Sequence, residues 1–306
     1  MTYAILVAVD GEAGHRAALD WAAARAARDG ARLRLVHVVE RAWGDAHDEP
    51  GTLLELAAGT LLDEEKRVAV QRIREAAARR VAVGSTAGEA EPPQLEVTTG
   101  MLYGHVAREL AAAATDADLL VIGTPSEAER AHAFIGSLAV RVAAAVDCTV
   151  VAVPHGWSGE GKGVVVGVDG DLPSEAAVAF ASDEAAALRE PLTIVCAGYL
   201  ANPLLTGLVP EISVADARER IVARAAAQAR AAHPGLVVFT EVVETSAARG
   251  IVAESDGSHL LVIGTHNRRG AKRVMLGSVG HDVLLNARTP IAVVRGLSAD
   301  APSTAL

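Results

Sequence analysis

The feature that most constrains the fold of this chain is a set of glycine landmarks that occurs twice. In the first half, the apolar run that ends in Gly123 is followed thirteen positions later by Gly136-Ser137. In the second half, the apolar run that ends in Gly264 is followed, again thirteen positions later, by Gly277-Ser278. The same landmarks at the same spacing predict two copies of one domain.

An Asp-Gly pair marks the start of each copy. Asp10-Gly11 and Asp169-Gly170 each end an apolar run, and they are 159 positions apart, whereas Gly123 and Gly264 are 141 positions apart. The second copy is therefore shorter, and the missing residues fall between its second and fourth strands. We expect domains at 1–155 and 163–297, a linker at 156–162 and a flexible tail at 298–306.

Composition agrees with two soluble domains. A chain of 306 residues exceeds a typical single core. A formal net charge of −10 argues against general binding to nucleic acid or anionic lipid. No stretch approaches the roughly 20 apolar residues of a membrane span, and no basic signal segment is evident at the start. We expect a cytoplasmic protein without membrane or nucleic-acid partners, in which Cys148 and Cys196 are inert buried residues rather than a disulfide or metal pair.

The order of apolar runs and helical patterns predicts an α/β fold. Strands that alternate with helices form right-handed βαβ units, so we expect two tandem, doubly wound, five-stranded parallel sheets of the Rossmann-like type. In the first half we expect strands at 3–10, 33–39, 94–99 and 118–123, helices at 14–29, about 62–83 and 102–115, and a loop at 43–60. Ligands of such sheets bind beyond the carboxyl ends of the strands, where Asp10, Gly123, Asp169 and Gly264 fall.

The Gly-Ser pairs have a chemical interpretation. Each begins a short helix, and a helix N-terminus offers free N–H groups and a positive dipole end, which together bind phosphate. The alternative is a serine cap and a strand-ending turn without a ligand. Similarly, Asp10 and Asp169 can each accept a hydrogen bond from an adenine amino group or a ribose hydroxyl, or can simply form an Asx turn. The sequence leaves these alternatives open.

The whole arrangement resembles the universal stress protein family in its tandem two-domain form. The resemblance covers nearly the whole chain and is carried by Val7-Ala8-Val9-Asp10-Gly11, Ala117 to Gly123, Gly136-Ser137 and their second-half counterparts. The nucleotide-binding branch of that family has a glycine, two residues, a second glycine, nine residues, and then Gly-Ser or Gly-Thr. Here the second glycine is replaced by Ser126 in the first half and by Asn267 in the second. Asn tolerates left-handed backbone best among non-glycine residues, so Asn267 is the milder departure.

The resemblance implies an adenine-nucleotide α-hydrolase-like fold and a set of site residues. In the first half these are Asp10 and the backbone of Val38 on the adenine side, and Gly123, Ser126, Gly136, Ser137 and Leu138 on the phosphate side. In the second half they are Asp169 and Ala197 on the adenine side, and Gly264, His266, Asn267, Gly277, Ser278 and Val279 on the phosphate side. The cofactor implied is ATP, with or without Mg²⁺.

Charge distinguishes the two sites. The second-half loop at 265–276 holds Arg268, Arg269, Lys272 and Arg273 and no acid, whereas the first-half loop at 124–135 holds Glu127, Glu129 and Arg130. A basic loop raises the local concentration of a triphosphate, so we expect the second half to bind ATP more tightly. The alternative is that both loops are solvated surface whose charges point away from the site.

Several chemistries have no signal here. The chain lacks a Walker motif, a Gly-x-Gly-x-x-Gly after its first strand and paired carboxylates near a nucleophile. Its ten histidines show no metal-ligand spacing, so we predict neither catalytic nor metal-binding residues. His37 is expected to be a satisfied core residue, and His266 has the best position for a ligand.

The leading hypothesis is an ATP-binding regulatory protein of the stress response. The alternatives are a nucleotide-free protein-interaction scaffold and a slow Mg²⁺-dependent ATPase. The apolar terminal strands 149–153 and 291–295 suggest pairing, either between the two halves or in a homodimer.

Overall fold

The computed structural model describes residues 3–40, 53–82, 95–125, 137–198, 211–265 and 276–296. The chain divides into two compact units, Met1–Ser158 and Gly159–Leu306. The division falls inside the segment 156–162 that the sequence suggests as a linker.

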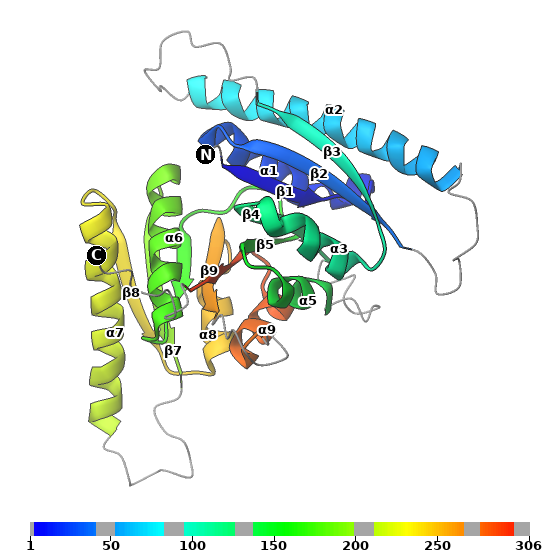
Figure 1. Ribbon diagram of the computed structural model, residues 1–306. Helices are drawn as coiled ribbons and strands as arrows, with labels where there is room; N and C mark the ends of the chain where they lie inside the picture. Colours follow the sequence, from blue (N-terminus) through cyan, green and yellow to red (C-terminus); the bar gives the residue numbers. More distant parts are fainter. Residues whose placement is uncertain are drawn as a thin grey trace, which may run out of the picture. The chain divides into compact units, whose positions relative to one another are not determined.

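The first unit is built on a five-stranded parallel sheet. Its strands are β1 (Ala4–Ala8), β2 (Arg32–Val39), β3 (Val97–Tyr103), β4 (Leu119–Thr124) and β5 (Thr149–Pro154), in the order β3-β2-β1-β4-β5. Helix α1 (Ala17–Asp29) packs on α2 (Leu53–Ala82), and α3 (Val106–Ala113) packs on α5 (Ser137–Ala145). In Figure 1 the two helix pairs cover opposite faces of the sheet. Short 3-10 turns, η1 (Ala13–His15) and η2 (Ala114–Asp116), precede α1 and follow α3.

The second unit repeats this plan. Strands β6 (Val164–Gly167), β7 (Leu192–Ala197), β8 (Val238–Val243), β9 (Leu260–Thr265) and β10 (Ile291–Arg295) are parallel in the order β8-β7-β6-β9-β10. Helix α6 (Leu172–Leu188) packs on α7 (Glu211–Ala232), and α8 (Ala247–Glu254) packs on α9 (Ser278–Asn286). The prediction of two tandem, doubly wound parallel-sheet domains is confirmed.

Burial on both faces of each sheet accounts for the apolar composition. Leu119, Leu120 and Val121 in β4 have no exposed area, and the helices that cover the sheet contribute fully buried alanines such as Ala22 and Ala26. Small alanine side chains let a helix approach a sheet of branched residues closely, at the packing density of a protein interior. In the described ranges, no helix combines the length and apolar composition needed to cross a lipid bilayer.

Two elements differ from the sequence prediction. Helix α2 begins at Leu53, inside the stretch expected to be a loop. Gly59 disfavours a helix there. Leu53, Leu54 and Leu56 are mostly exposed, whereas Ala58 and Leu62 are buried, so packing supports the helix only from about Ala58 onward. Strand β3 continues to Tyr103, where a helix was expected, because it pairs with β2 along its whole length, from Leu33 opposite Val97 to Val39 opposite Tyr103.

Both cysteines are free thiols. Cys196 lies in β7 and is buried. Burial raises the pKa of the Cys196 thiol, the nearby Asp169 carboxylate adds to the rise, and the Arg218 guanidinium partly opposes it. The reactive thiolate is therefore disfavoured, in keeping with an inert packing role.

Candidate functional site

In each unit the strand order reverses beside the first strand, which lies between the second and the fourth. The crevice outside the carboxyl ends of the strands at such a reversal is where open α/β sheets bind ligands. Asp10 follows β1 and Gly123 is the penultimate residue of β4, while Asp169 and Gly264 hold the same places beside β6 and β9. The structure thus brings the first and fourth strand-end residues of each half to one edge, as the sequence predicted.

The Asp-Gly pair forms the same turn in both units. Asp10 Oδ1 accepts a hydrogen bond from the Glu12 N–H at 2.9 Å, and Asp169 Oδ1 accepts one from the Asp171 N–H at 3.0 Å. The glycines Gly11 and Gly170 have φ angles of 83° and 90°, which only glycine adopts without strain. The Asx turn that the sequence left as one alternative is therefore present in both halves.

The partner of this aspartate differs between the units. In the first, His15 Nδ1 lies 2.7 Å from Asp10 Oδ2. In the second, the Ser174 hydroxyl donates to Asp169 Oδ1 at 2.6 Å. His15 and Ser174 each stand five positions after the aspartate, so the two halves offer different chemistry on one scaffold.

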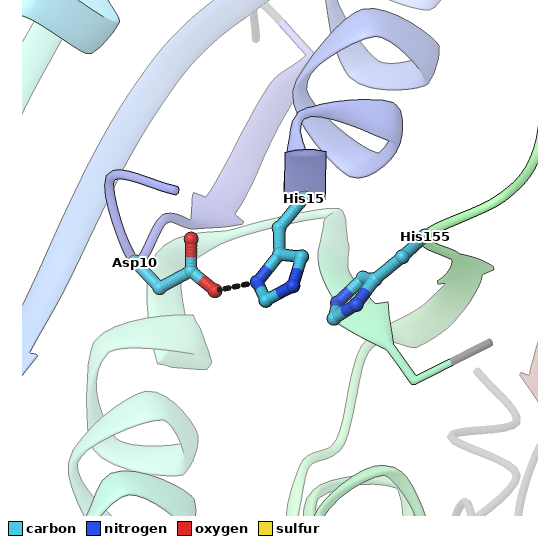
Figure 2. Close-up of side chains that lie close together, drawn as sticks. All are labelled: Asp10, His15 and His155. Atoms are coloured by element: carbon cyan, nitrogen blue, oxygen red, sulfur yellow. Dashed lines mark hydrogen bonds and ion pairs between the residues drawn. The ribbon is translucent and has the colours of Figure 1, made fainter. Parts of the chain in front are cut away.

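A second imidazole, that of His155, also distinguishes the first unit from the second. His155 directly follows β5, and its ring stacks on that of His15 with 3.7 Å between centroids and 19° between planes (Figure 2). A Cβ on Gly123 would lie 3.0 Å from His155 Nε2, so the ring covers this glycine closely. The backbone N–H of His155 donates to Thr124, and the N–H of Gly296 donates to the matching Thr265. Gly296 therefore holds the place of His155 in the second unit and carries no side chain.

A cavity of about 230 Å³ lies at this edge of the first unit. Of the predicted site residues, Asp10, Val38, Gly123 and Leu138 line it. Among the described lining residues, the charged side chains are Asp10, Glu12, Glu65 and Arg16. Within this set carboxylates outnumber the guanidinium, which favours a cation over a phosphate.

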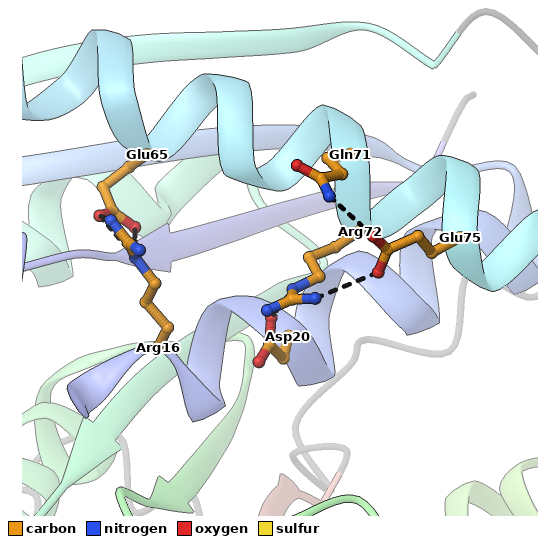
Figure 3. Close-up of polar contacts among 6 residues, drawn as sticks. All are labelled: Arg16, Asp20, Glu65, Gln71, Arg72 and Glu75. Atoms are coloured by element: carbon orange, nitrogen blue, oxygen red, sulfur yellow. Dashed lines mark hydrogen bonds and ion pairs between the residues drawn. The ribbon is translucent and has the colours of Figure 1, made fainter. Parts of the chain in front are cut away.

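An ion pair between α1 and α2 closes one side of that cavity (Figure 3). Arg16 donates through Nε and a terminal nitrogen to Glu65 Oε1, at 3.0 and 2.8 Å, and Glu65 is only 2% exposed. This hydrogen bonding raises the pKa of the Arg16 guanidinium, against the effect of burial. Further along the same helices, Arg72 donates hydrogen bonds to the carboxylates of Asp20 and Glu75, at 2.8 and 3.1 Å.

The second unit has the same pair with its charges exchanged. Glu175 and Arg224 stand 159 positions after Arg16 and Glu65, and their side chains form an ion pair between α6 and α7. A cavity of about 200 Å³ lies beside them, lined by Gly170, Ser174 and Arg220 among others. Ala197 and Gly264 are not among its described lining residues, so it does not unite the predicted adenine and phosphate sides.

The start of α9 offers the phosphate-binding geometry most clearly. Gly277 is the N-cap residue, with φ −57° and ψ 158° and no side-chain hydrogen bond to the helix end. Ser278 is the first helical residue, so the alternative of a Ser278 cap is wrong for this helix. The His281 N–H donates to the Gly277 carbonyl, and the amides of Ser278, Val279 and Gly280 therefore face outward from the helix end. Around Gly277, no described atom lies within 4 Å of where a Cβ would stand.

Some predicted site residues lie outside the described ranges: Ser126, Gly136, His266 and Asn267, together with the charged residues of both loops. Ser137 begins α5. His37 has a hydrogen-bond partner as expected, with its Nδ1 2.8 Å from the Val9 carbonyl oxygen, but it is only partly buried and lines the first-unit cavity rather than the core.

Three further residues lie at these strand ends that the sequence pattern did not indicate. His15 and His155 lie at the first, and the spacing of five positions after Asp10 was the available signal for His15. Arg218 lies at the second, where it donates to the Gly198 carbonyl at 2.6 Å, directly after β7. It places a positive charge near the carboxyl end of that strand.

Comparison with known proteins agrees with the duplicated architecture. The model of the universal stress protein family matches residues 1–154 and again residues 162–295. A universal stress protein of Mycolicibacterium smegmatis is 29% identical over 305 residues, which cover 96% of this chain and 97% of that protein. One from Mycobacterium tuberculosis is 28% identical, with 96% and 97% covered.

The fold has counterparts among solved structures as well. The crystal structure of a universal stress protein from Archaeoglobus fulgidus superposes with a TM-score of 0.59 at 14% identity, covering 95% of this chain and 98% of that one. At this identity the likeness concerns the fold alone. The two matches to the family model span nearly the whole sequence, and the chain belongs to the universal stress protein family.

Proposed function

We propose that the second unit binds an adenine nucleotide, ATP foremost, and that its occupancy regulates a stress response. The observation that carries this proposal is the open start of α9, where a glycine N-cap precedes three outward-facing amides. Such a helix end combines hydrogen-bond donors with the positive end of the helix dipole, and both favour a phosphate group.

The surrounding residues give this site two sides. Gly277, Ser278, Val279 and Gly264 would hold the phosphates, together with His266 and Asn267 of the loop between them. Asp169 and Ala197 would hold the adenine side. Mg²⁺, where it takes part, would be bound largely by the phosphates and water, as is usual for this ion.

Charge supports the second unit over the first. Arg218 stands at the carboxyl end of β7, and the loop that precedes α9 carries four basic residues in its sequence. In the first unit, by contrast, the His155 ring covers Gly123 and carboxylates dominate the cavity. A polyanion is therefore attracted to one edge and disfavoured at the other.

The decisive experiment is calorimetric titration of the full chain with ATP, comparing wild type with Gly277→Asp. Asp is a favourable N-cap residue, and the backbone and the open space at Gly277 accept it, so the helix should stay folded. Its carboxylate would occupy the amides and repel phosphate. We expect the affinity for ATP to fall by about 10- to 100-fold, the value of charge-assisted hydrogen bonds worth ~1.5–3 kcal/mol.

Gly235→Asp is the matched control, because Gly235 is also open but lies in the turn between α7 and β8, at the amino ends of the strands. It should leave the affinity for ATP unchanged. Equal ATP affinities for wild type and Gly277→Asp would refute the proposed site. Failure of the wild type to bind any adenine nucleotide would leave the scaffold alternative, and phosphate release above the Gly277→Asp level would indicate an ATPase. Cytoplasmic localisation and pairing through β5 and β10 stay predictions.

A further inference from the structure

We propose that the first unit holds a binding site for a divalent transition-metal ion of the zinc type, formed by Asp10, His15 and His155. Each residue offers one ligand atom, and the three atoms lie within 4.8 Å of one another. The residues come from the loop after β1, from η1 and from the end of β5, and Figure 2 shows them gathered at one point. This inference concerns another unit and another ligand than the proposed nucleotide site, and it does not depend on it.

The donor set selects the ion. Two imidazoles and one carboxylate, with a further position open, are typical of Zn²⁺ sites that bind an exogenous ligand. Mg²⁺ and Ca²⁺ prefer oxygen ligands throughout, so the two imidazoles disfavour them. Among first-row ions in comparable sites, Zn²⁺ and Cu²⁺ bind more tightly than Mn²⁺ or Fe²⁺.

The geometry requires only side-chain movement. Zinc–ligand distances of about 2.0–2.2 Å place tetrahedral ligand atoms about 3.3 Å apart. Asp10 Oδ2 and His15 Nδ1 are 2.7 Å apart and need to separate slightly to admit the ion. His155 would rotate out of its stack on His15 to bring a ring nitrogen to the same point.

The electrostatic setting favours a cation. Asp10 is half exposed and His15 is 22% exposed, and all three residues line the cavity, so an ion has access from solvent. Glu12 Oε2 lies 3.5 Å from His15 Nε2 and can orient this ring from its far side, as outer carboxylates do for metal-bound histidines. The Arg16 guanidinium, which lines the same cavity, is engaged by Glu65.

The second unit provides an internal control. It keeps the aspartate and its turn, as Asp169, but has Ser174 and Gly296 where the first unit has the two histidines. The turn and the fold therefore form without imidazoles. A scaffold role alone does not account for the pair of histidines at this edge.

The test is a zinc titration of the metal-free full chain in competition with a chromophoric chelator, without nucleotide. His15→Ser/His155→Gly copies the second unit into the first, and we expect one zinc equivalent to be lost or weakened at least about 100-fold, since even outer-shell changes cost 10- to 100-fold. His233→Ser is the matched control. His233 lies 2.7 Å from Asp183 in the second unit, a histidine–carboxylate pair outside the three-residue cluster, and its loss should leave the stoichiometry unchanged.

A second measurement guards against misfolding of the double variant. In the wild type, the ring nitrogen resonances of His15 and His155 should shift on addition of Zn²⁺ and not on addition of Mg²⁺. Unchanged zinc affinity and stoichiometry in a folded double variant would overturn the site. Ring resonances of both histidines that ignore saturating Zn²⁺ would overturn it equally.

Discussion

The carboxyl ends of the strands form a candidate site in each unit, and the two sites have the same backbone conformation but different side chains. Both have an Asp-Gly turn in which the aspartate carboxylate accepts a hydrogen bond from the backbone N–H two positions on, and both have a glycine at positive φ. The first edge then adds His15 and His155, and the second adds Ser174 and Gly296. The helices behind them carry one ion pair in opposite orientations, Arg16 with Glu65 and Glu175 with Arg224.

Features present in both units, such as the turn, the strand order and a helix-to-helix ion pair, do not distinguish the two sites. Features present in one unit, such as the imidazole pair, distinguish its chemistry. Each of the following predictions tests that division.

The largest expected effect concerns the two ion pairs. Arg16→Met would leave the buried Glu65 carboxylate without its cation and should cost about 3 kcal/mol in the free energy of unfolding. Arg224→Met breaks a pair whose side chains are 74% and 42% exposed, so it should cost less than about 1 kcal/mol. Urea unfolding of both variants measures the difference. The exchange Arg16→Glu/Glu65→Arg copies the second unit and should recover more than half of the loss; no recovery would show that the two positions are not equivalent.

The second prediction concerns the helix starts that follow the glycine landmarks. Gly277→Asp should weaken ATP binding to the full chain by at least about tenfold, because its carboxylate would occupy the helix-start amides proposed to hold phosphate in the second unit. Gly136→Asp, the corresponding change in the first half, should change ATP affinity by less than about twofold. Calorimetry on the two variants decides. If Gly136→Asp is the more damaging variant, the proposed assignment of the nucleotide to the second unit is reversed.

The third prediction concerns the glycines of the shared turn. Gly11→Ala and Gly170→Ala each place a side chain at positive φ, which costs about 1–2 kcal/mol. Gly11→Ala should be the worse, because its Cβ would stand 2.4 Å from Leu61 Cδ1, whereas that of Gly170→Ala would stand 3.0 Å from Ile221 Cδ1. Thermal unfolding measures both. Adding Leu61→Ala should narrow the gap, and an unchanged gap would mean that crowding is not its cause.

The smallest effect concerns pH and Cys196. Burial, with the Asp169 carboxylate adding and Arg218 opposing, raises the pKa of this thiol, so the folded state holds the proton more tightly than the unfolded state. The resulting stability is complete below the unfolded pKa of about 8.5 and is lost as the pH rises toward the folded value. Cys196→Ala should therefore flatten the decline of the melting temperature between pH 8 and 10. Val195→Ala, a buried neighbour that does not titrate, should keep the wild-type slope.

The duplicated pattern was sufficient to predict two tandem parallel sheets and, in each sheet, the strand ends at which Asp10 and Gly123, or Asp169 and Gly264, lie. Alternating runs of apolar residues determine strands that are buried on both faces, and parallel connection brings their carboxyl ends together. The residues at which helices and strands begin and end were harder to predict. The end of β3 at Tyr103 depends on its pairing with β2 along its whole length. The first residues of α2 are mostly exposed, so no buried stripe in the sequence indicates that the helix starts at Leu53.

The imidazole pair could not be predicted from the spacing of residues in the sequence. His15 and His155 are separated by most of the first unit, and they meet because β5 ends beside β4, next to the turn after β1. Metal-ligand motifs with short spacing do not include such a pair. Once the strand register is known, His155 is found at the same position as Gly296 of the second unit, and the histidine pair becomes visible as a difference between the two units.

The Asp-Gly turn has a consequence for how a duplicated domain can diverge. Its closing bond joins the carboxylate to a backbone N–H two positions on, and this bond is the same whether the fifth residue is His15 or Ser174. A mutation at that fifth position therefore leaves the conformation of the turn unchanged, so natural selection can act on the side chain alone. After gene duplication, one copy can acquire a new ligand while its sister keeps the ancestral one, with little penalty in foldability for either.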